Sequence, residues 1–475
     1  DRQPYKFDNN DLEILKELSV NARKSSVEIE NKISVTPKTV INKIKRLQKM
    51  EVIVGFKPSL YITEADISTK RLLLKYHNYS LDDENALVQY LKAHPNVIGL
   101  TKTVGEWDIM IDMSLFGPKK VMGLDIGTSS IKIVELALGK QPQITNYGVV
   151  ENVNHLTQPG ESLQSSAHAM GPENVSDLLK QLLSKSGIRN GEAYATYPIF
   201  SSFATLLDFP ALSKDEVDRT ISYSFRKYVP LNPEETAYEW IEAGEKKVSQ
   251  LGDFSGGGMV KKLFFLTAIS KKIIANYTTA IESVGLHLKS IESETLSVLR
   301  IMRVTSRLEG KTIAVLDIGA YSTNIIVIRN GYVVVNRGLD SGGGDITRSI
   351  ARGLGVDGTH AEEMKKKNGL SYSVEQAAVY QLVYFALDFI LEEAKRVFGM
   401  YSSKFDEPIS EVVLIGGASL LTGVDGYFSE KLGIKTMLYT PMHYFGVKQE
   451  ATFVVDRIFP QLVVATGAAL KSGEV

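Results

Sequence analysis

The sequence contains no cysteine among its 475 residues. This absence excludes disulfide bonds, a thiol nucleophile and thiolate metal ligands, and it suits a reducing compartment. No stretch reaches the ~18 unbroken apolar residues that a membrane-spanning helix needs. Asp1, Arg2 and Lys6 precede any apolar segment, which is not the pattern of a secretory signal. We therefore expect a cytoplasmic chain without a membrane span of its own.

The chain also lacks a net charge of either sign, because 54 Lys and Arg are balanced by 55 Asp and Glu. Such a balance gives no general reason to expect nucleic-acid binding, although a local basic patch can still exist. Hydrophobic residues make up 44% of the chain and charged residues 23%, as in soluble globular proteins. Since one domain usually holds about 150 residues, we expect several domains.

The first 60 residues predict a small helical unit whose third helix has clear boundaries. Thr36 is a good N-cap, and Pro37 follows at the first helical position, where its missing N–H costs nothing. Apolar residues then recur at helical spacing and are predicted to face the core. These core positions are Val40, Ile41, Ile44 and Leu47.

The other faces of this helix are basic, and no acid lies between Glu30 and Glu51. Lys and Arg neutralise phosphates, while Asn and Thr reach base edges, so the pattern is typical of a DNA-recognition helix. The charges alone would equally fit a solvated basic face. The residues predicted to contact DNA are Lys38, Thr39, Asn42, Lys43 and Arg46.

The next segment predicts a strand, a helix and two strands, at Thr69–Tyr76, Leu81–Ala93, Val97–Thr103 and Gly105–Met113. With the helices before it, this order resembles the Lrp/AsnC regulators, and Gly105–Asp108 is similar to their Gly-x-x-Asp turn. The sensor domain of that family is a βαββαβ unit, whose last helix and strand are absent here. The resemblance implies a winged helix-turn-helix at 1–60 and a truncated ferredoxin-like βαββ unit at 66–112, with one unpaired sheet edge.

Residues 113–475 begin like an independent protein, since Met113–Lys120 leads straight into a predicted strand. We therefore expect a fusion of a regulator fragment with a second protein, and the sequence does not distinguish a natural fusion from an engineered one or from an artefact of sequence assembly. Alternating strands and helices with short turns predict an α/β architecture for this second part.

One motif occurs twice in this part, at Leu124–Ser130 and Leu316–Ser322, each time before an apolar strand. A Gly in such a turn lets backbone N–H groups approach a phosphate, and an Asp at the strand end can hold a water of Mg²⁺. A single Asp-x-Gly turn is commonly an ordinary hairpin. Its recurrence predicts two turns that clamp one polyphosphate.

Three further elements have the composition of nucleotide contacts. Val412–Ser419 is a buried-type strand that ends in two glycines, against which an adenine could lie. Glu362 and Lys365 are one helical turn apart and could reach the ribose and base, although an exposed charge pair is the plainer interpretation. The glycines of Ser341–Asp345 precede a helix and could face phosphate or serve as a simple connection.

In this order the five elements resemble the phosphate loops, adenosine motif and ribose helix of the actin, sugar-kinase and heat-shock-chaperone superfamily. Gly123–Leu136 is similar to the opening of PilM proteins, cytoplasmic assembly factors of type IV pili, and Phe225–Leu231 resembles another segment of theirs. The resemblance implies an actin-like ATPase fold, a duplicated ribonuclease H-like fold, with a subdomain inserted at about 190–290. It also implies ATP, Mg²⁺ and a groove for the cytoplasmic tail of PilN, an inner-membrane protein.

The residues assigned to nucleotide binding are Asp125, Gly127, Thr128, Ser129, Ser130, Lys132, Asp317, Gly319, Ser322, Gly343, Gly344, Glu362, Lys365, Gly416, Gly417 and Ser419. Asp125 and Asp317 are also the predicted Mg²⁺ ligands. Asp317 and Glu294 are the candidate catalytic groups of a weak ATPase at most, because hydrolysis needs a positioned water and base whereas binding needs only the clamp. The seven His residues show no metal-like spacing.

The predicted function is an ATP-binding cytoplasmic scaffold of type IV pilus assembly. It would lie at the inner membrane through a PilN-like partner, with other pilus assembly proteins, a second copy of itself and DNA as further partners to test. Three alternatives stay open: an FtsA-like filament-forming division protein, a sugar or acetate kinase, and a DNA-binding transcriptional regulator. An FtsA-like protein usually ends in an amphipathic membrane helix, for which Ala468–Val475 is too short. A kinase needs a sugar-binding cluster, which the sequence does not show.

Overall fold

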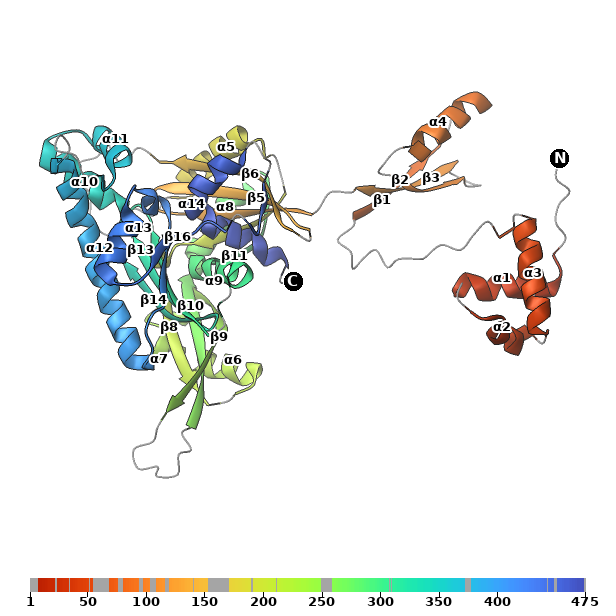
Figure 1. Ribbon diagram of the computed structural model, residues 1–475, viewed down its shortest axis with the longest axis horizontal. Coiled ribbons are helices and arrows are strands. Elements are labelled where there is room, and N and C mark those ends of the chain that lie inside the picture. Colours follow the sequence, from red (N-terminus) through yellow and green to blue (C-terminus); the bar gives the residue numbers. More distant parts are fainter. Residues whose placement is uncertain are drawn as a thin grey trace.

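The computed structural model describes residues 7–21, 24–33, 35–50, 52–53, 68–75, 80–93, 97–102, 108–115, 119–139, 141–152, 171–188, 191–210, 212–248, 259–306, 308, 310–371, 377–441, 443–447 and 451–473. These residues form a helical unit, a small sheet unit and a large main body (Figure 1). The predicted domain boundaries stay predictions. Residues 54–67 lie outside the described part, and residue 113 lies within the strand Ile109–Leu115.

The N-terminal unit consists of α1 (Asn9–Val20), α2 (Ser26–Ile33) and α3 (Pro37–Lys49). The side chain of Thr36 caps α3, with Pro37 in its first turn, as predicted. Ile14, Ile29 and Val40 form the core between the three helices. Ile41, predicted to face this core, is 43% exposed. That prediction was wrong because Ile41 lies a full 100° around the helix from Val40, away from the buried stripe.

The second unit is the predicted partial βαββ unit, with β1 (Ser68–Leu74), α4 (Leu81–Ala93), β2 (Val97–Lys102) and β3 (Ile109–Leu115). Its antiparallel sheet has the order β1-β3-β2, so that β1 has a neighbour on one side only within the described residues. Leu91 from α4 packs on Ile109 and Ile111. The predicted turn at 105–108 falls largely outside the described residues.

The main body contains two larger sheets whose strands are β4 (Lys120–Ile126), β5 (Ser130–Ala137), β6 (Gln143–Glu151), β7 (Gly191–Tyr197), β11 (Leu286–Ser293) and β17 (Gly446–Val447) in the first, and β12 (Thr312–Ile318), β13 (Thr323–Arg329), β14 (Tyr332–Leu339), β15 (Glu411–Ile415) and β16 (Thr436–Leu438) in the second. The order β6-β5-β4-β7-β11 in the first sheet corresponds to β14-β13-β12-β15-β16 in the second. In each sheet the first three strands pair antiparallel and the last two are parallel. The predicted duplication is therefore confirmed at the level of topology.

Helices cover both sheets in layers. Between the sheets lie α9 (Glu294–Thr305) and α14 (Thr452–Leu470), which share one core with both inner faces. The outer helices are α5 (Pro172–Ser186) and α8 (Lys271–Glu282) on the first sheet, and α10 (Gly343–Leu354), α11 (Gly358–Asn368), α12 (Ala377–Phe405) and α13 (Val424–Leu432) on the second. Each half thus buries an apolar face on either side of its sheet.

The central helix α14 approaches its neighbours unusually closely. A Cβ at Gly123 would lie 1.7 Å from the carbonyl oxygen of Ala465, and one at Gly467 would lie 2.1 Å from that of Ser297, so both positions require glycine. The segment Thr452–Gly473 is long and apolar enough to cross a membrane by length and composition, but 67% of its most apolar window is buried inside the fold. Its apolar character is explained by its central position.

A third, smaller sheet has the order β8-β10-β9, with β8 (Ser202–Phe209), β9 (Thr236–Val248) and β10 (Met259–Ser270). It packs against α6 (Lys214–Tyr223) and α7 (Phe225–Tyr228), and buried Val217, Ile221 and Phe264 lie in the shared core. Its strands run from residue 202 to 270. The strands β7 and β11, within the predicted range of about 190–290, belong to the first large sheet, and the range itself stays a prediction.

Candidate functional site

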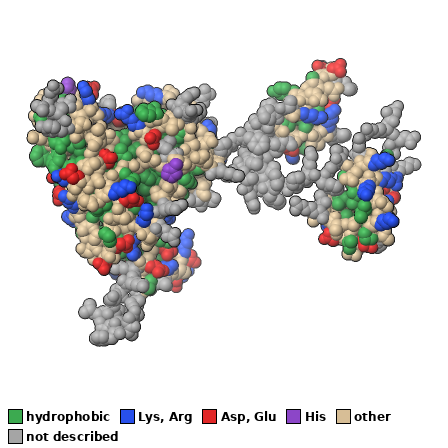
Figure 2. Space-filling view, viewed as in Figure 1, with side chains coloured by type: hydrophobic (Ala, Val, Ile, Leu, Met, Phe, Trp, Pro, Cys, Tyr) green, Lys and Arg blue, Asp and Glu red, His purple; other side chains and the backbone are tan. Residues whose placement is uncertain are grey.

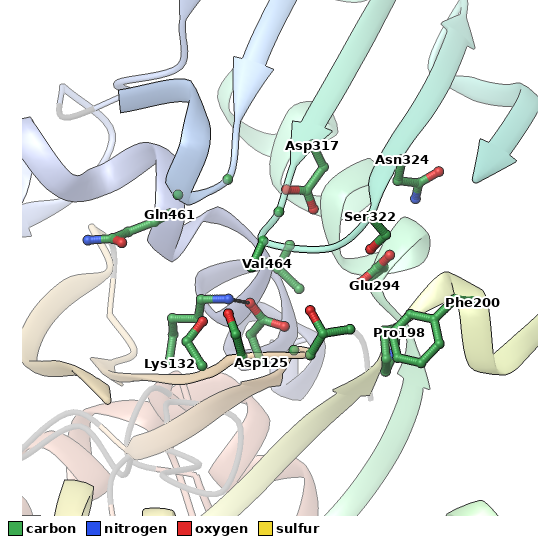
Figure 3. Close-up of a pocket in the computed structure, with 18 of the residues that line it drawn as sticks. Asp125, Lys132, Pro198, Phe200, Glu294, Asp317, Ser322, Asn324, Gln461 and Val464 are labelled. Carbon is green, nitrogen blue, oxygen red and sulfur yellow. Dashed lines mark ion pairs between the residues drawn. The ribbon is translucent and has the colours of Figure 1, made fainter. Parts of the chain in front are cut away.

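The alternation of side chains along a strand places the two motif aspartates on the inner faces of their sheets. In β4, Met122 and Leu124 face the outer helices, so Asp125 points the other way, as Asp317 does in β12. Both side chains line one pocket between the two halves of the main body. Figure 3 shows Asp317 on one side of this pocket and Asp125 with Lys132 on the other.

The two predicted phosphate turns have the same backbone geometry. The N–H of Gly127 donates to the carbonyl of Ser130 at 3.0 Å, and the N–H of Gly319 donates to that of Ser322 at 2.9 Å. The predicted residues that line the pocket are Asp125, Gly127, Thr128, Ser129, Ser130, Lys132, Glu294, Asp317, Gly319, Ser322, Gly416 and Gly417. Residues from four separate sequence segments therefore converge on one pocket.

The charges in the pocket are unbalanced, with three carboxylates and one lysine among its described lining residues. The Lys132 ammonium lies 2.9 Å from Oδ2 of Asp125. Burial alone would lower the pKa of Lys132, but the charge and hydrogen bond of Asp125 and the charges of Asp317 and Glu294 together outweigh it, so that this pKa is raised. Burial, together with the charge of Asp125, raises the pKa of Asp317 to about 7. The pocket is thus electrostatically short of a cation.

Glu294 is the first residue of α9 and lies partly buried in the pocket wall. Its Oε1 accepts the backbone N–H of Ile199 at 3.0 Å. Burial, then the charges of Asp317 and Asp125, raise the pKa of Glu294 well above its usual range. Ile199 opens η4 (Ile199–Ser201), which leads into β8 of the small sheet. Glu294 therefore connects the pocket to the start of that sheet.

Gly416 follows β15 in a conformation that excludes a side chain. Its φ is +88°, and a Cβ there would lie 2.5 Å from Oδ1 of Asp317. Ser419, predicted to contact nucleotide, is fully buried and donates its hydroxyl to the carbonyl of Gly416 at 2.7 Å. It lies behind the pocket lining and supports the glycine turn.

The backbone N–H groups of Gly343 and Gly344 are already paired within the protein, and their assignment to nucleotide binding stays a prediction. The N–H of Gly343 donates to the carbonyl of Gly319 at 2.9 Å, and that of Gly344 to the carbonyl of Ala320 at 2.6 Å. These first N–H groups of α10 are already used by the second phosphate turn. The two glycines thereby hold that turn in place.

Lys365 and Glu362 lie beside this support and outside the pocket lining. Lys365 is only 7% exposed, and its ammonium donates to the carbonyl of Gly343 at 3.0 Å and to Oγ1 of Thr347 at 2.9 Å. Glu362 pairs with it at 2.5 Å. The interpretation as an exposed surface pair is therefore wrong, because burial makes the pair part of the packing between α10 and α11.

Sequence reasoning missed several lining residues, of which Asn324 is the most informative. Asp125 pairs in register with Lys132, and Asp317 pairs in register with Asn324, so the two residues occupy equivalent positions in the two halves. The spacing of seven residues after each Asp could have revealed it. Asn324 is 2% exposed, and its Oδ1 has no hydrogen-bond partner in the described part of the chain. A polar group of a ligand would satisfy it.

Phe200, Pro198 and Gln461 also line the pocket without having been predicted. Their positions depend on η4 and on the middle of α14, which no local motif marks. No group of three or more acidic or His residues close enough to hold a metal ion occurs among the described residues.

The predicted DNA-contacting residues all lie on α3, but they differ in their surroundings. Lys38 and Asn42 are exposed, and Figure 2 shows Lys and Arg side chains on this unit. Lys43 instead forms ion pairs with Asp8 and Asp11, the capping residues of α1. Its ammonium joins α1 to α3 in this structure, and its assignment to DNA stays a prediction.

The two equivalent sheets, with matching turns on either side of one pocket, define an actin-like ATPase fold. Over residues 123–473 the sequence matches the family described as type IV pilus assembly protein PilM, and the chain belongs to this family. A solved PilM–PilN type IV pilus biogenesis complex has the same fold, with 21% identity and a TM-score of 0.60 over 74% of this chain and 98% of that chain.

Two curated proteins are similar to different parts of the chain. The cell division protein FtsA of Streptococcus pneumoniae is 22% identical over 361 residues, which are 69% of this chain and 77% of that protein. The HTH-type transcriptional regulator Ptr1 of Methanocaldococcus jannaschii is 34% identical over 102 residues, which are 22% of this chain and 68% of that protein. Residues 7–54 match the winged helix-turn-helix DNA-binding family. The N-terminal part therefore belongs with HTH-type regulators.

Proposed function

We propose that the chain is an ATP-binding scaffold protein of type IV pilus assembly that carries a DNA-binding regulator fragment at its N-terminus. The observation that supports nucleotide binding most directly is the convergence of Asp125, Asp317 and both Gly-containing turns on one pocket. Random surface motifs would not meet in this way. Membership of the PilM family supplies the biological setting.

The pocket residues fit a Mg²⁺-bound polyphosphate. Asp125 and Asp317 would hold Mg²⁺, directly or through water, and the missing positive charge described above would be supplied by the metal. The hydroxyls of Thr128, Ser129 and Ser322 are donors for phosphate oxygens. Gly416 would let the adenine approach the backbone.

Hydrolysis is not required for this role. Because Oε1 of Glu294 already accepts the N–H of Ile199, we assign Glu294 a positioning role between the pocket and the small sheet rather than that of a general base. A change in the pocket would then alter the start of that sheet. ATP binding would thereby set the shape of a partner groove without turnover.

We propose a PilN-like inner-membrane protein as the partner, bound through its cytoplasmic tail in a groove beside the small sheet. Support comes from the solved PilM–PilN complex, because the match covers 98% of the chain in that structure. The chain would then be cytoplasmic and held at the inner membrane by its partner. Titrating the full chain with a fluorescent PilN tail peptide, with and without Mg·ATP, tests this. Equal affinities in both titrations would contradict nucleotide control.

Thermal unfolding tests the nucleotide assignment itself. Millimolar Mg·ATP is expected to raise the melting temperature of the full chain, because a ligand that binds only the folded state stabilises it. Asp125→Ala should lose this shift, whereas Glu430→Gln on the exposed surface of α13 should keep it. An unchanged melting temperature of the unmodified chain would sink the proposal.

A second function, DNA binding, is favoured by the exposed Lys38 and Asn42 on α3 and by the winged helix-turn-helix match. A gel shift at several salt concentrations tests it. Affinity should fall steeply with salt, and Lys38→Ala should reduce the slope by about one for the lost phosphate contact. A salt-independent signal would argue against this interface.

A further inference from the structure

The outward face of α12 carries large apolar side chains that nothing in the described structure covers. Phe385 is 69% exposed, Phe389 is 59% exposed and Met400 is 61% exposed. Hydrophobic side chains are visible along the flank of the main body that α12 forms (Figure 2). Scattered exposed apolar residues are ordinary, but three on one face of one helix mark a contact surface.

Charged residues lie between these apolar positions along α12. The acidic residues Glu392 and Glu393 come first, and the basic residues Lys395 and Arg396 follow them. Glu392 pairs with Lys395 at 2.7 Å, and Arg396 pairs with Glu393 at 2.5 Å. The side chains of Glu392 and Arg396 remain 61% and 52% exposed, so each can accept a second partner. A guanidinium has five donors, of which one carboxylate uses two.

Gly399, in the same region, has no visible role inside the molecule. Glycine costs about 1 kcal/mol in a helix interior relative to alanine. A Cβ at this position would meet nothing within 4 Å in the described part of the fold, so that no intramolecular contact requires its absence. A missing side chain on an exposed face allows another helix to come close.

We propose that this face of α12 binds the same face of a second copy of the chain, with the two helices antiparallel about a twofold axis that crosses the exposed face at the level of residue 394. Such an axis sets Glu392 of each copy opposite Arg396 of the other, and Phe389 against the stretch Gly399–Met400 of the other. The surface is therefore self-complementary in both charge and shape, as a twofold interface requires. A groove for an unrelated protein would not need charges of opposite sign placed symmetrically.

A charge swap tests the proposal. Sedimentation velocity of the full chain, from micromolar to about 100 μM, should show a reversible dimer. Glu392→Arg and Arg396→Glu should each weaken the dimer at least tenfold by placing like charges opposite each other, and the double variant should restore it. Glu430→Arg, an equal charge change on α13, is the matched control and should have no effect. A double variant no better than the single variants, or a chain that stays monomeric, overturns the proposal.

Cross-linking gives an independent test, since the chain contains no cysteine. Lys395→Cys lies next to the proposed axis, so a short bismaleimide should join two copies. Ser403→Cys should not react in this way, because the two copies of residue 403 would be about 27 Å apart along the helices at 1.5 Å per residue. Equal cross-linking at both positions would exclude the proposed register. Gly399→Gln should raise the melting temperature of the chain and weaken the dimer. If Gly399 had only an intramolecular role, the substitution would not raise the melting temperature while weakening the dimer.

Discussion

The two halves of the main body have the same strand order and the same turn, yet they differ beside their carboxylates. In the first half the residue in register with Asp125 is Lys132, which forms an ion pair with it at 2.9 Å. In the second half the residue in register with Asp317 is the neutral Asn324. The carboxylate of Asp125 therefore has a lysine as its register partner, whereas the carboxylate of Asp317 does not.

This difference gives the two carboxylates different roles. The pKa of Asp317 is raised to about 7 by burial and by the charge of Asp125. A cation from solution would relieve this cost, so Asp317 is the side of the pocket at which Mg²⁺ gains most. The protein thus supplies a positive charge beside Asp125 but a neutral amide beside Asp317.

The largest effect is expected when the first half loses its cation. Lys132→Met leaves three buried carboxylates together, and removing one partner of a buried ion pair costs about 3–5 kcal/mol. Urea unfolding should therefore show a loss of this order. Adding Mg²⁺ without nucleotide should recover more stability in this variant than in the unmodified chain. If Mg²⁺ stabilises both proteins equally, the metal does not bind between these carboxylates.

The pH dependence of the free energy of unfolding should reveal the protonation of Asp317 in the second half. The pKa of Asp317 is raised to about 7 in the folded state, from an ordinary value of 3.8. Between these values the folded state holds more protons than the unfolded state, so stability is fully present below pH 3.8 and is lost as the pH rises toward 7. The loss is on the order of a few kcal/mol.

Asp317→Asn should flatten this part of the pH profile, since an amide does not titrate in this range. Urea unfolding at intervals between pH 4 and 8, without Mg²⁺, measures it. Glu362→Gln is a suitable comparison, because the pKa of Glu362 is lowered and not raised. If Asp317→Asn leaves the slope unchanged, another group in the pocket holds the proton.

The glycine after β15 offers a smaller test of the second half. Gly416→Ala combines a positive φ with a Cβ that would press on Oδ1 of Asp317 at 2.5 Å. Gly433→Ala has a similar φ of +66° but meets nothing within 4 Å in the described structure. Both should lose about 1 kcal/mol from backbone strain. Gly416→Ala should lose about 1–2 kcal/mol more and should also weaken ATP binding, whereas equal losses would show that only the backbone matters.

The fold and most of the pocket could be predicted because they depend on local patterns that repeat. The turns after Asp125 and Asp317 are set by neighbouring residues. The similarity in sequence between Leu124–Ser130 and Leu316–Ser322 already implied two equivalent halves. The alternation along β4 and β12 then fixed which way each Asp points. Such information is contained within a few residues.

The remainder depended on contacts between distant segments. Phe200, which lines the pocket, follows Ile199, whose N–H donates to Glu294 95 residues away. Gly343 looked like a phosphate donor, but its N–H is used by Gly319. Lys43 matched the basic pattern of α3, yet Asp8 and Asp11 hold it against α1. In each case a partner far away in the sequence decides what the residue does, and no local pattern contains that partner.

The smallest expected effect concerns the ion pair that joins the two halves at the surface. Lys366 of α11 lies 3.2 Å from Glu151 at the end of β6, and their side chains are 56% and 51% exposed. Exposed pairs of this kind contribute about 0–1 kcal/mol, because water and salt screen them. Lys366→Ala should therefore change the free energy of unfolding by less than about 1 kcal/mol, and 0.5 M NaCl should remove the difference. Lys180→Ala, which breaks an exposed pair within α5 alone, is the control. A loss above about 2 kcal/mol from Lys366→Ala that persists in salt would show that the two halves are held together at this edge and not through α9 and α14.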